Sequence, residues 1–190
     1  MPATSQVPAA FPEIDRQTRD SGFTMPSELL TCSLLRTLAA SKPGGRFLEL
    51  GTGTGLSASW ILDGMDAGST LVSVDNAPEF LDIAIRHLGT DPRAAFVCRD
   101  GGEWLEENKN SRFDFIFADT WHGKYLLLDE ALALLTTGGV YFIDDMLPQA
   151  NWPEGHDGKA AALRATLAAR PDLDVTEMDW ASGLIIAVKK

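Results

Sequence analysis

Short apolar stretches alternate with segments of helical periodicity through the middle of the chain. The apolar stretches cover residues 46–50, 70–74, 94–98, 113–118 and 139–143. Helices are expected between them, at about 56–65, 78–88, 102–108 and 122–135. Strands that are apolar throughout and separated by helices are typical of a parallel sheet covered on both faces. The pattern therefore predicts a doubly wound α/β sheet with five parallel strands.

The C-terminal segment departs from this alternation. After a helix at about 157–169, two further strands at 173–179 and 183–188 are separated by three residues, Trp180 to Ser182. Parallel neighbours need a crossover of about a dozen residues or more, so these strands form an antiparallel hairpin. We therefore predict a Rossmann-like sheet of seven strands, five parallel plus a C-terminal antiparallel hairpin, in three layers.

The N-terminal segment shows little periodicity. Residues 1–23 include Pro2, Pro8 and Pro12 and are interpreted as an extended arm. Leucines at helical spacing then predict a first helix from Pro26 until Pro43 ends it. Residues 24–190 are expected to form one domain.

The net charge of the chain limits the classes of partner that it is expected to bind. The chain has 190 residues with a formal net charge of -11, and residues 46–150 carry 17 acids and seven bases. Nucleic acid and anionic membranes are therefore disfavoured, because both are bound through clustered Lys and Arg. Cys32 and Cys98 are too few for a disulfide framework or a zinc site. With no predicted secretory signal or membrane span, we expect a cytoplasmic protein.

A glycine-rich loop follows the first strand. It reads E-L-G-T-G-T-G over residues 49–55. The third glycine of the dinucleotide fingerprint would fall at Leu56, and no Gly-Lys-Ser/Thr follows as in a P-loop. The loop suits a ligand that presents a carboxylate and a ribose, and a simple tight turn is the alternative.

Acidic residues follow each of the other parallel strands. Asp75 follows the second strand and is placed to accept the hydroxyls of a ribose. Asp100 follows the third, where it accepts from an exocyclic amine or caps the next helix. Asp119, Asp144 and Asp145 follow the fourth and fifth. Their convergence predicts a Mg²⁺ or Ca²⁺ site, and a loop cap that faces solvent is the alternative.

These motifs, in this order, resemble those of a class I S-adenosylmethionine (SAM)-dependent methyltransferase. E-L-G-T-G-T-G, Asp75, A-D-T-W-H-G-K-Y and I-D-D are similar to motifs of the catechol and caffeoyl-CoA O-methyltransferase group, over residues 22–188. The resemblance implies a SAM-dependent enzyme that methylates a hydroxyl oxygen of a small-molecule acceptor.

The resemblance also implies a set of binding residues. Trp121 would stack near the adenine, and Tyr125 would lie beneath the methionyl carboxylate. The implied cofactor-binding residues are Met25, Ser27, Glu49, Gly51, Thr52, Gly53, Ser57, Asp75, Asn76, Asp100, Gly101, Asp119, Trp121 and Tyr125. Asp119, Asp144 and Asp145 fall where that group holds a divalent cation.

Two positions differ from the family pattern. Asp145 stands where the third metal ligand is normally Asn, and His122 stands where the family has a catalytic lysine. His122 is a candidate base, with an exposed helix residue as the alternative. Lys124, two residues further on, is a candidate substitute for the family's lysine. His156 is a second candidate base. Asp119 completes the candidate catalytic set.

Two other functions compete with this interpretation. An NAD(P)-dependent oxidoreductase is disfavoured by Leu56 and by the C-terminal hairpin. A non-catalytic SAM-binding adaptor remains the alternative because of the changes at His122 and Asp145. Trp152, in the loop after the fifth strand, suggests a flat apolar acceptor. A homodimer is compatible with the sequence.

Overall fold

The computed structural model describes residues 7–149 and 152–190. The first six residues of the expected arm and Ala150–Asn151 of the loop after the fifth strand lie outside the described residues. Seven strands form one sheet in the described part of the chain. They are β1 (Arg46–Leu50), β2 (Thr70–Asp75), β3 (Ala94–Cys98), β4 (Phe113–Ala118), β5 (Leu135–Ile143), β6 (Leu173–Met178) and β7 (Leu184–Lys189).

The strand order in the sheet is β3-β2-β1-β4-β5-β7-β6. The first five strands in this order pair in parallel, and β7 pairs antiparallel with both β5 and β6. The predicted sheet, including its C-terminal hairpin, is therefore confirmed. Because β1 and β4 are neighbours, the loops that follow them meet at the carboxyl edge of the sheet, where doubly wound folds bind ligands.

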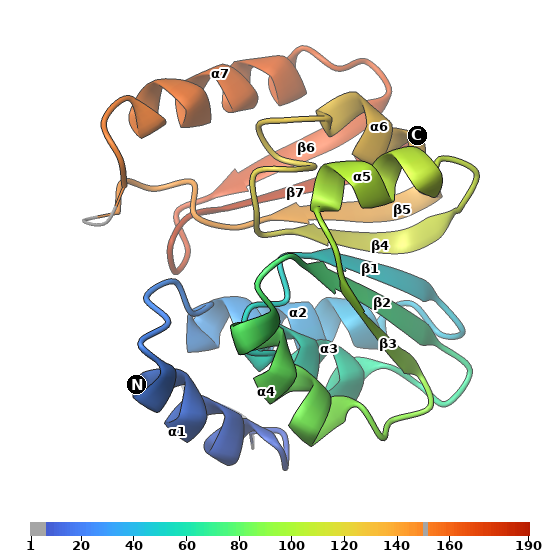
Figure 1. Cartoon of the computed structure of the whole chain (residues 1–190). Helices are drawn as coiled ribbons and strands as arrows, with labels where there is room; N and C mark the ends of the chain where they lie inside the picture. Colours follow the sequence, from blue (N-terminus) through green and yellow to red (C-terminus); the bar gives the residue numbers. More distant parts are fainter. Residues whose placement is uncertain (1–6, 150–151) are drawn as a thin grey trace.

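Helices cover both faces of the sheet (Figure 1). One face carries α1 (Phe11–Ser21), α2 (Leu29–Ala40), α3 (Leu56–Gly64) and α4 (Pro78–Leu88), and the other carries α5 (Gly101–Glu107), α6 (Leu128–Ala133) and α7 (His156–Ala168). Alternate side chains of one strand enter separate cores: Phe115 packs with the first group of helices, and Ile116 packs with the second. Burial on both faces explains why the strands are apolar throughout.

The expected extended arm is corrected by α1. This helix buries Ile14 completely and packs Phe11 edge-on against Trp60 of α3, with ring centroids 5.7 Å apart. Its buried residues, Phe11, Ile14 and Thr18, stand at the helical spacing i, i+3 and i+7, so the sequence carried a helical signal here that the interpretation as an arm missed. Exposed Arg16 pairs with Glu13 and Asp20, one turn away on either side.

Two predicted helices are shorter than expected. The first begins at Leu29 rather than near Pro26. The helix expected at 122–135 is reduced to α6, because residues 121–126 form a compact turn in which the carbonyl of Gly123 accepts a hydrogen bond from the buried Tyr141 hydroxyl. Among the described residues, no helix has both the length and the apolar content needed to cross a membrane.

Candidate functional site

The glycine-rich loop lies tightly packed between its neighbours. Gly51 has φ 101°, and a Cβ there would lie 2.7 Å from the carbonyl oxygen of Asp119. Gly53 has φ 52°, and its Cβ would lie 2.9 Å from the ring of Phe23. Both positions therefore need glycine, for their left-handed backbone and for the close approach of neighbouring groups.

Asp75 holds this loop from the end of β2. Its Oδ2 accepts the backbone N–H of Gly53 at 2.7 Å, and its Oδ1 accepts that of Ala77 at 2.9 Å. Each carboxylate oxygen retains a second lone pair, and the side chain lines a cavity of about 220 Å³. The carboxylate can therefore accept further hydrogen bonds from a ligand in that cavity.

Most of the expected cofactor-binding residues line this first cavity. The cavity is lined by Met25, Ser27, Gly51, Thr52, Gly53, Ser57, Asp75, Asn76 and Asp119 of the expected set. Phe23 and Phe80 also line it, with ring centroids 4.8 Å apart, and the sequence did not indicate them. Because 57 residues separate these two rings, no local pattern could have revealed the pair.

Glu49 lies beneath the loop and does not line the cavity. Its carboxylate is fully buried and accepts hydrogen bonds from Ser57, at 2.6 Å, and from Ser73. Burial raises the pKa of Glu49 to about 7 despite these bonds. Ser57 lines the cavity, so Glu49 reaches it through this hydroxyl rather than directly.

A separate crevice lies beside Asp75 and Asn76, and Asp100 is not among the residues that line it. Asp100 caps α5, and its Oδ1 accepts the N–H groups of Gly102 and Glu103 at 2.9 and 3.1 Å. The capping alternative for Asp100 is therefore observed. Gly101 and His122 line the crevice.

His122 is not placed with the other candidate bases. Its Nδ1 lies 3.8 Å from Oδ2 of Asp100, and its ring packs against Gly101 and Gly102. The turn at 121–126 directs it toward α5. His122 therefore lines neither of the cavities that Lys124 and His156 line, and its role as a base stays a prediction.

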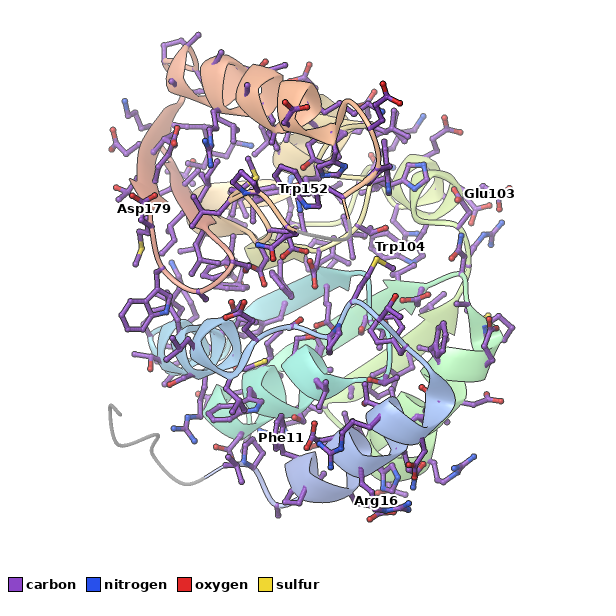
Figure 2. All side chains as sticks on the ribbon, turned by 90° about the vertical axis from the view of Figure 1, so that its left-hand side faces the viewer. Phe11, Arg16, Glu103, Trp104, Trp152 and Asp179 are labelled. Carbon is purple, nitrogen blue, oxygen red and sulfur yellow. The ribbon has the colours of Figure 1, made fainter. Side chains whose placement is uncertain are left out.

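A second cavity, of about 310 Å³, adjoins the first. Trp121, Tyr125, Trp152 and His156 form its aromatic wall, and Lys124 also lines it. Trp121 and Tyr125 line this cavity and not the first one, and the adenine and carboxylate contacts that the resemblance implied for them stay predictions. Figure 2, which shows the left-hand side of Figure 1, places Trp152 between α7 and the loops at the ends of the strands.

Tyr125 and His156 are joined across this second cavity. The Tyr125 hydroxyl lies 3.0 Å from Nε2 of His156, whose ring also contacts Trp121 and Trp152. Burial raises the pKa of Tyr125 to about 12. Burial, and then the charge of Lys124, lower the pKa of His156, so its ring is neutral at neutral pH.

Three carboxyl groups lie at or near the junction of the two cavities. Asp119 and Asp145 line both cavities, and Asp144, next to Asp145 in the chain, is buried. Ser27 donates to Asp119 at 3.2 Å, while Asp144 accepts the Ser182 hydroxyl and, at 2.8 Å, the N–H of Asp145. Burial raises the pKa of Asp119 well above its usual range and that of Asp144 to about 6.

These carboxyl groups do not form a metal-ligand set. Within residues 7–149 and 152–190, no three acidic, His or Cys side chains are grouped so that they could hold a metal ion. Asp144 is directed to Ser182 instead. The described side chains therefore show no preformed cation site, and the expected cation stays a prediction.

Comparison with known families decides the class of this fold. The profile of a family described as "Methyltransferase domain" matches residues 48–146, which include the glycine-rich loop, Asp75 and the three carboxyl groups. The chain belongs to this methyltransferase family. The family resemblance inferred from the motifs is confirmed at this level.

Similar proteins support the assignment. A Mycobacterium marinum protein named "Putative O-methyltransferase" is 29% identical over 141 residues, which cover 70% of this methyltransferase-family chain and 62% of the relative. The chain thus spans about three fifths of that relative's length.

Two solved structures share the fold. An O-methyltransferase from Bacillus cereus in complex with SAH (S-adenosylhomocysteine) has a TM-score of 0.83 at 21% identity, over 96% of this chain and 91% of that one. TomG, an O-methyltransferase from Streptomyces achromogenes in complex with SAM, has a TM-score of 0.81 at 20% identity, over 97% and 91%.

Proposed function

We propose that this protein transfers a methyl group from SAM to a hydroxyl oxygen of a small-molecule acceptor. The observation that carries the proposal is the junction of the two cavities. Met25, Asp119, Thr120 and Asp145 line both of them. A donor in the first cavity and an acceptor in the second would therefore meet at these residues.

The residues of the first cavity fit SAM. Asp75 has free lone pairs for the ribose hydroxyls. The carboxyl group of Asp145 also lines the junction and favours a cation there. When bound, SAM supplies a methyl group on a positively charged sulfur. The walls of the two cavities supply proximity and orientation, which lower the barrier to transfer.

His156 is proposed as the base that accepts the hydroxyl proton. It lines the second cavity, and its lowered pKa keeps the ring neutral at neutral pH. In the tautomer whose Nε2–H donates to the Tyr125 oxygen, the buried Nδ1, which has no partner among the described residues, carries the lone pair. Tyr125 orients the ring through the hydrogen bond to Nε2. Lys124 lines the same cavity and is the alternative base.

Calorimetric titration with SAH tests the cofactor assignment. We expect micromolar binding by the wild type, and a loss of about 10- to 100-fold in affinity for Asp75→Ala because charged hydrogen-bond partners are removed. Asp66→Ala is the matched control, since Asp66 also accepts two backbone N–H groups, from Gly44 and Gly68, and lines neither cavity. Equal affinity of both variants for SAH would contradict the assignment of Asp75.

An assay of methyl transfer distinguishes a methyltransferase from a non-catalytic SAM-binding adaptor. Methyl-labelled SAM and 3,4-dihydroxybenzoate, with product detection by mass spectrometry, provide the first assay. Label in the acceptor supports the proposal. SAH binding without transfer to any of a panel of hydroxylated aromatic acceptors favours the adaptor.

Divalent-metal assistance stays a prediction of the resemblance, and no step above depends on it. It requires that Mg²⁺ raise the melting temperature of chelator-treated protein and that Asp144→Ala remove the rise. Coincident melting curves contradict it. A cytoplasmic location, a homodimer and the absence of nucleic-acid and membrane partners also stay predictions.

A further inference from the structure

A further large cavity lies behind the aromatic wall of the acceptor cavity. It measures about 560 Å³ and lies between residues 126–130 and α7. The two cavities share three lining residues, Trp121, Lys124 and Tyr125. The two cavities therefore adjoin at these side chains, and Tyr125 lies at the junction.

The floor of this cavity is apolar. Leu126, Leu127 and Leu128 line one side, and Ala162 and Leu163 of α7 line the other. Leu126 is 49% exposed, and Leu127 has φ 55°, a left-handed conformation that bulky residues rarely adopt. Strained backbone of this kind is retained where the surroundings or a function require it. Here it accompanies a continuous leucine surface beside the acceptor cavity.

The rim of the cavity carries charges of both signs, from Lys124, Asp129, Glu130, Lys159 and Arg170. Arg170 pairs with Asp129 and Asp172, and Nζ of Lys159 lies 4.4 Å from the centre of the Trp121 ring. Charges of both signs thus surround an apolar floor, which favours an uncharged apolar group over an ionic one.

We propose that the cavity holds an apolar chain attached to the methyl acceptor. This inference rests on the proposed function, because the alkyl chain is attached to the acceptor head, which is proposed to bind in the acceptor cavity. The hydroxylated head occupies the acceptor cavity, and the chain passes along Tyr125 onto the leucine floor. The acceptor class is accordingly a hydroxyl compound that carries an alkyl chain, and Leu126 and Tyr125 determine the length of alkyl chain accepted.

A series of alkyl esters of 3,4-dihydroxybenzoic acid, from methyl to octyl, tests this proposal. Calorimetry measures the affinity of each ester for the protein with and without SAH. We expect affinity to rise about two- to fourfold per methylene over the first members, as the chain enters the cavity. Equal affinities along the series, or no binding by any ester to a protein that binds SAH, would overturn the proposal.

Two variants test where the alkyl chain of the ester binds. Leu126→Asp places a charge on the floor and should bring the octyl-to-methyl affinity ratio close to one. Ile85→Asp is the matched control, because Ile85 is 43% exposed on α4 and lines neither cavity, and it should keep the wild-type ratio. The same ratio in both variants would show that the chain binds elsewhere and would overturn the proposal.

Methyl transfer to the methyl ester is measured in parallel. Chain-length-dependent binding that Leu126→Asp abolishes, in a protein without methyl transfer, supports the cavity and contradicts the proposed function. Transfer to the methyl ester without any effect of chain length supports the function and overturns the cavity. The two failures are therefore distinguishable.

Discussion

The hydroxyl oxygens of Thr18 and Thr54 lie 2.7 Å apart, and both side chains are buried. Thr18 belongs to α1, and Thr54 belongs to the glycine-rich loop. The hydroxyl of Thr18 also donates to the carbonyl of Ile14 at 2.8 Å. The N-terminal helix is thus coupled by a buried hydrogen bond to the loop that lines the cofactor cavity.

Thr18→Val keeps the shape of the side chain and leaves the Thr54 hydroxyl without this partner. We expect the free energy of unfolding to fall by about 1–2 kcal/mol and SAH affinity to fall about fivefold. Denaturant titration and calorimetry measure the two effects. Thr37→Val is the control, because the exposed Thr37 hydroxyl bonds only to Ser33, one turn before it in α2. If SAH affinity is unchanged in both variants, α1 does not support the loop.

Gly53→Ala should affect both stability and SAH binding. The left-handed backbone costs an alanine about 1–2 kcal/mol, and the added Cβ displaces Phe23 from the cavity. Gly138→Ala carries the same backbone cost, with φ 76° and open space around its Cβ. We therefore expect similar losses in the free energy of unfolding, and weaker SAH binding for Gly53→Ala alone. Weaker SAH binding by Gly138→Ala to the same degree would contradict the role of Phe23.

Glu49 makes stability depend on pH. Its pKa is about 7 in the folded protein against an ordinary value of 4.5, so the folded state binds the proton more tightly. The contribution of Glu49 to the free energy of unfolding is fully present below pH 4.5. It is lost as the pH rises to about 7, and the loss amounts to up to ~3 kcal/mol. Denaturant titrations from pH 5 to 8 should show this decline in the wild type and not in Glu49→Gln. Parallel curves would show that Glu49 is ionised normally.

His156 should set the acidic limb of the rate profile. The pKa of His156 is lowered from 6.5, so the ring stays neutral as the pH decreases past 6.5. We therefore expect kcat/KM to begin to fall only at a pH below 6.5, where the ring becomes protonated. His156→Gln should remove that limb and lower kcat about 10²- to 10⁴-fold. His87→Gln, at a histidine on α4 outside both cavities, should keep the wild-type profile. An unchanged limb in His156→Gln would assign the proton to another group, with Lys124 the next to test.

Local sequence accounts for most of the framework and for one half of the site. The strands, the C-terminal hairpin and the position of Asp75 follow from periodicity, chain length and turn residues. Each depends on neighbours a few residues away, or on the rule that parallel strands end at the same edge. The cofactor cavity could be predicted because its loops directly follow those strand ends.

The acceptor side depends on contacts that no local pattern contains. Residues 121–126 had the composition of a helix, but the buried Tyr141 hydroxyl holds Gly123 in a turn. That turn sends His122 to α5 and sends Trp121 and Tyr125 to His156, 31 residues beyond Tyr125. For α1 the helical spacing is present in the sequence, but the burial of Ile14 and Phe11 against other helices is not. Packing between distant segments, which has no signature along the chain, decided both the shape of the acceptor cavity and the support of the glycine loop.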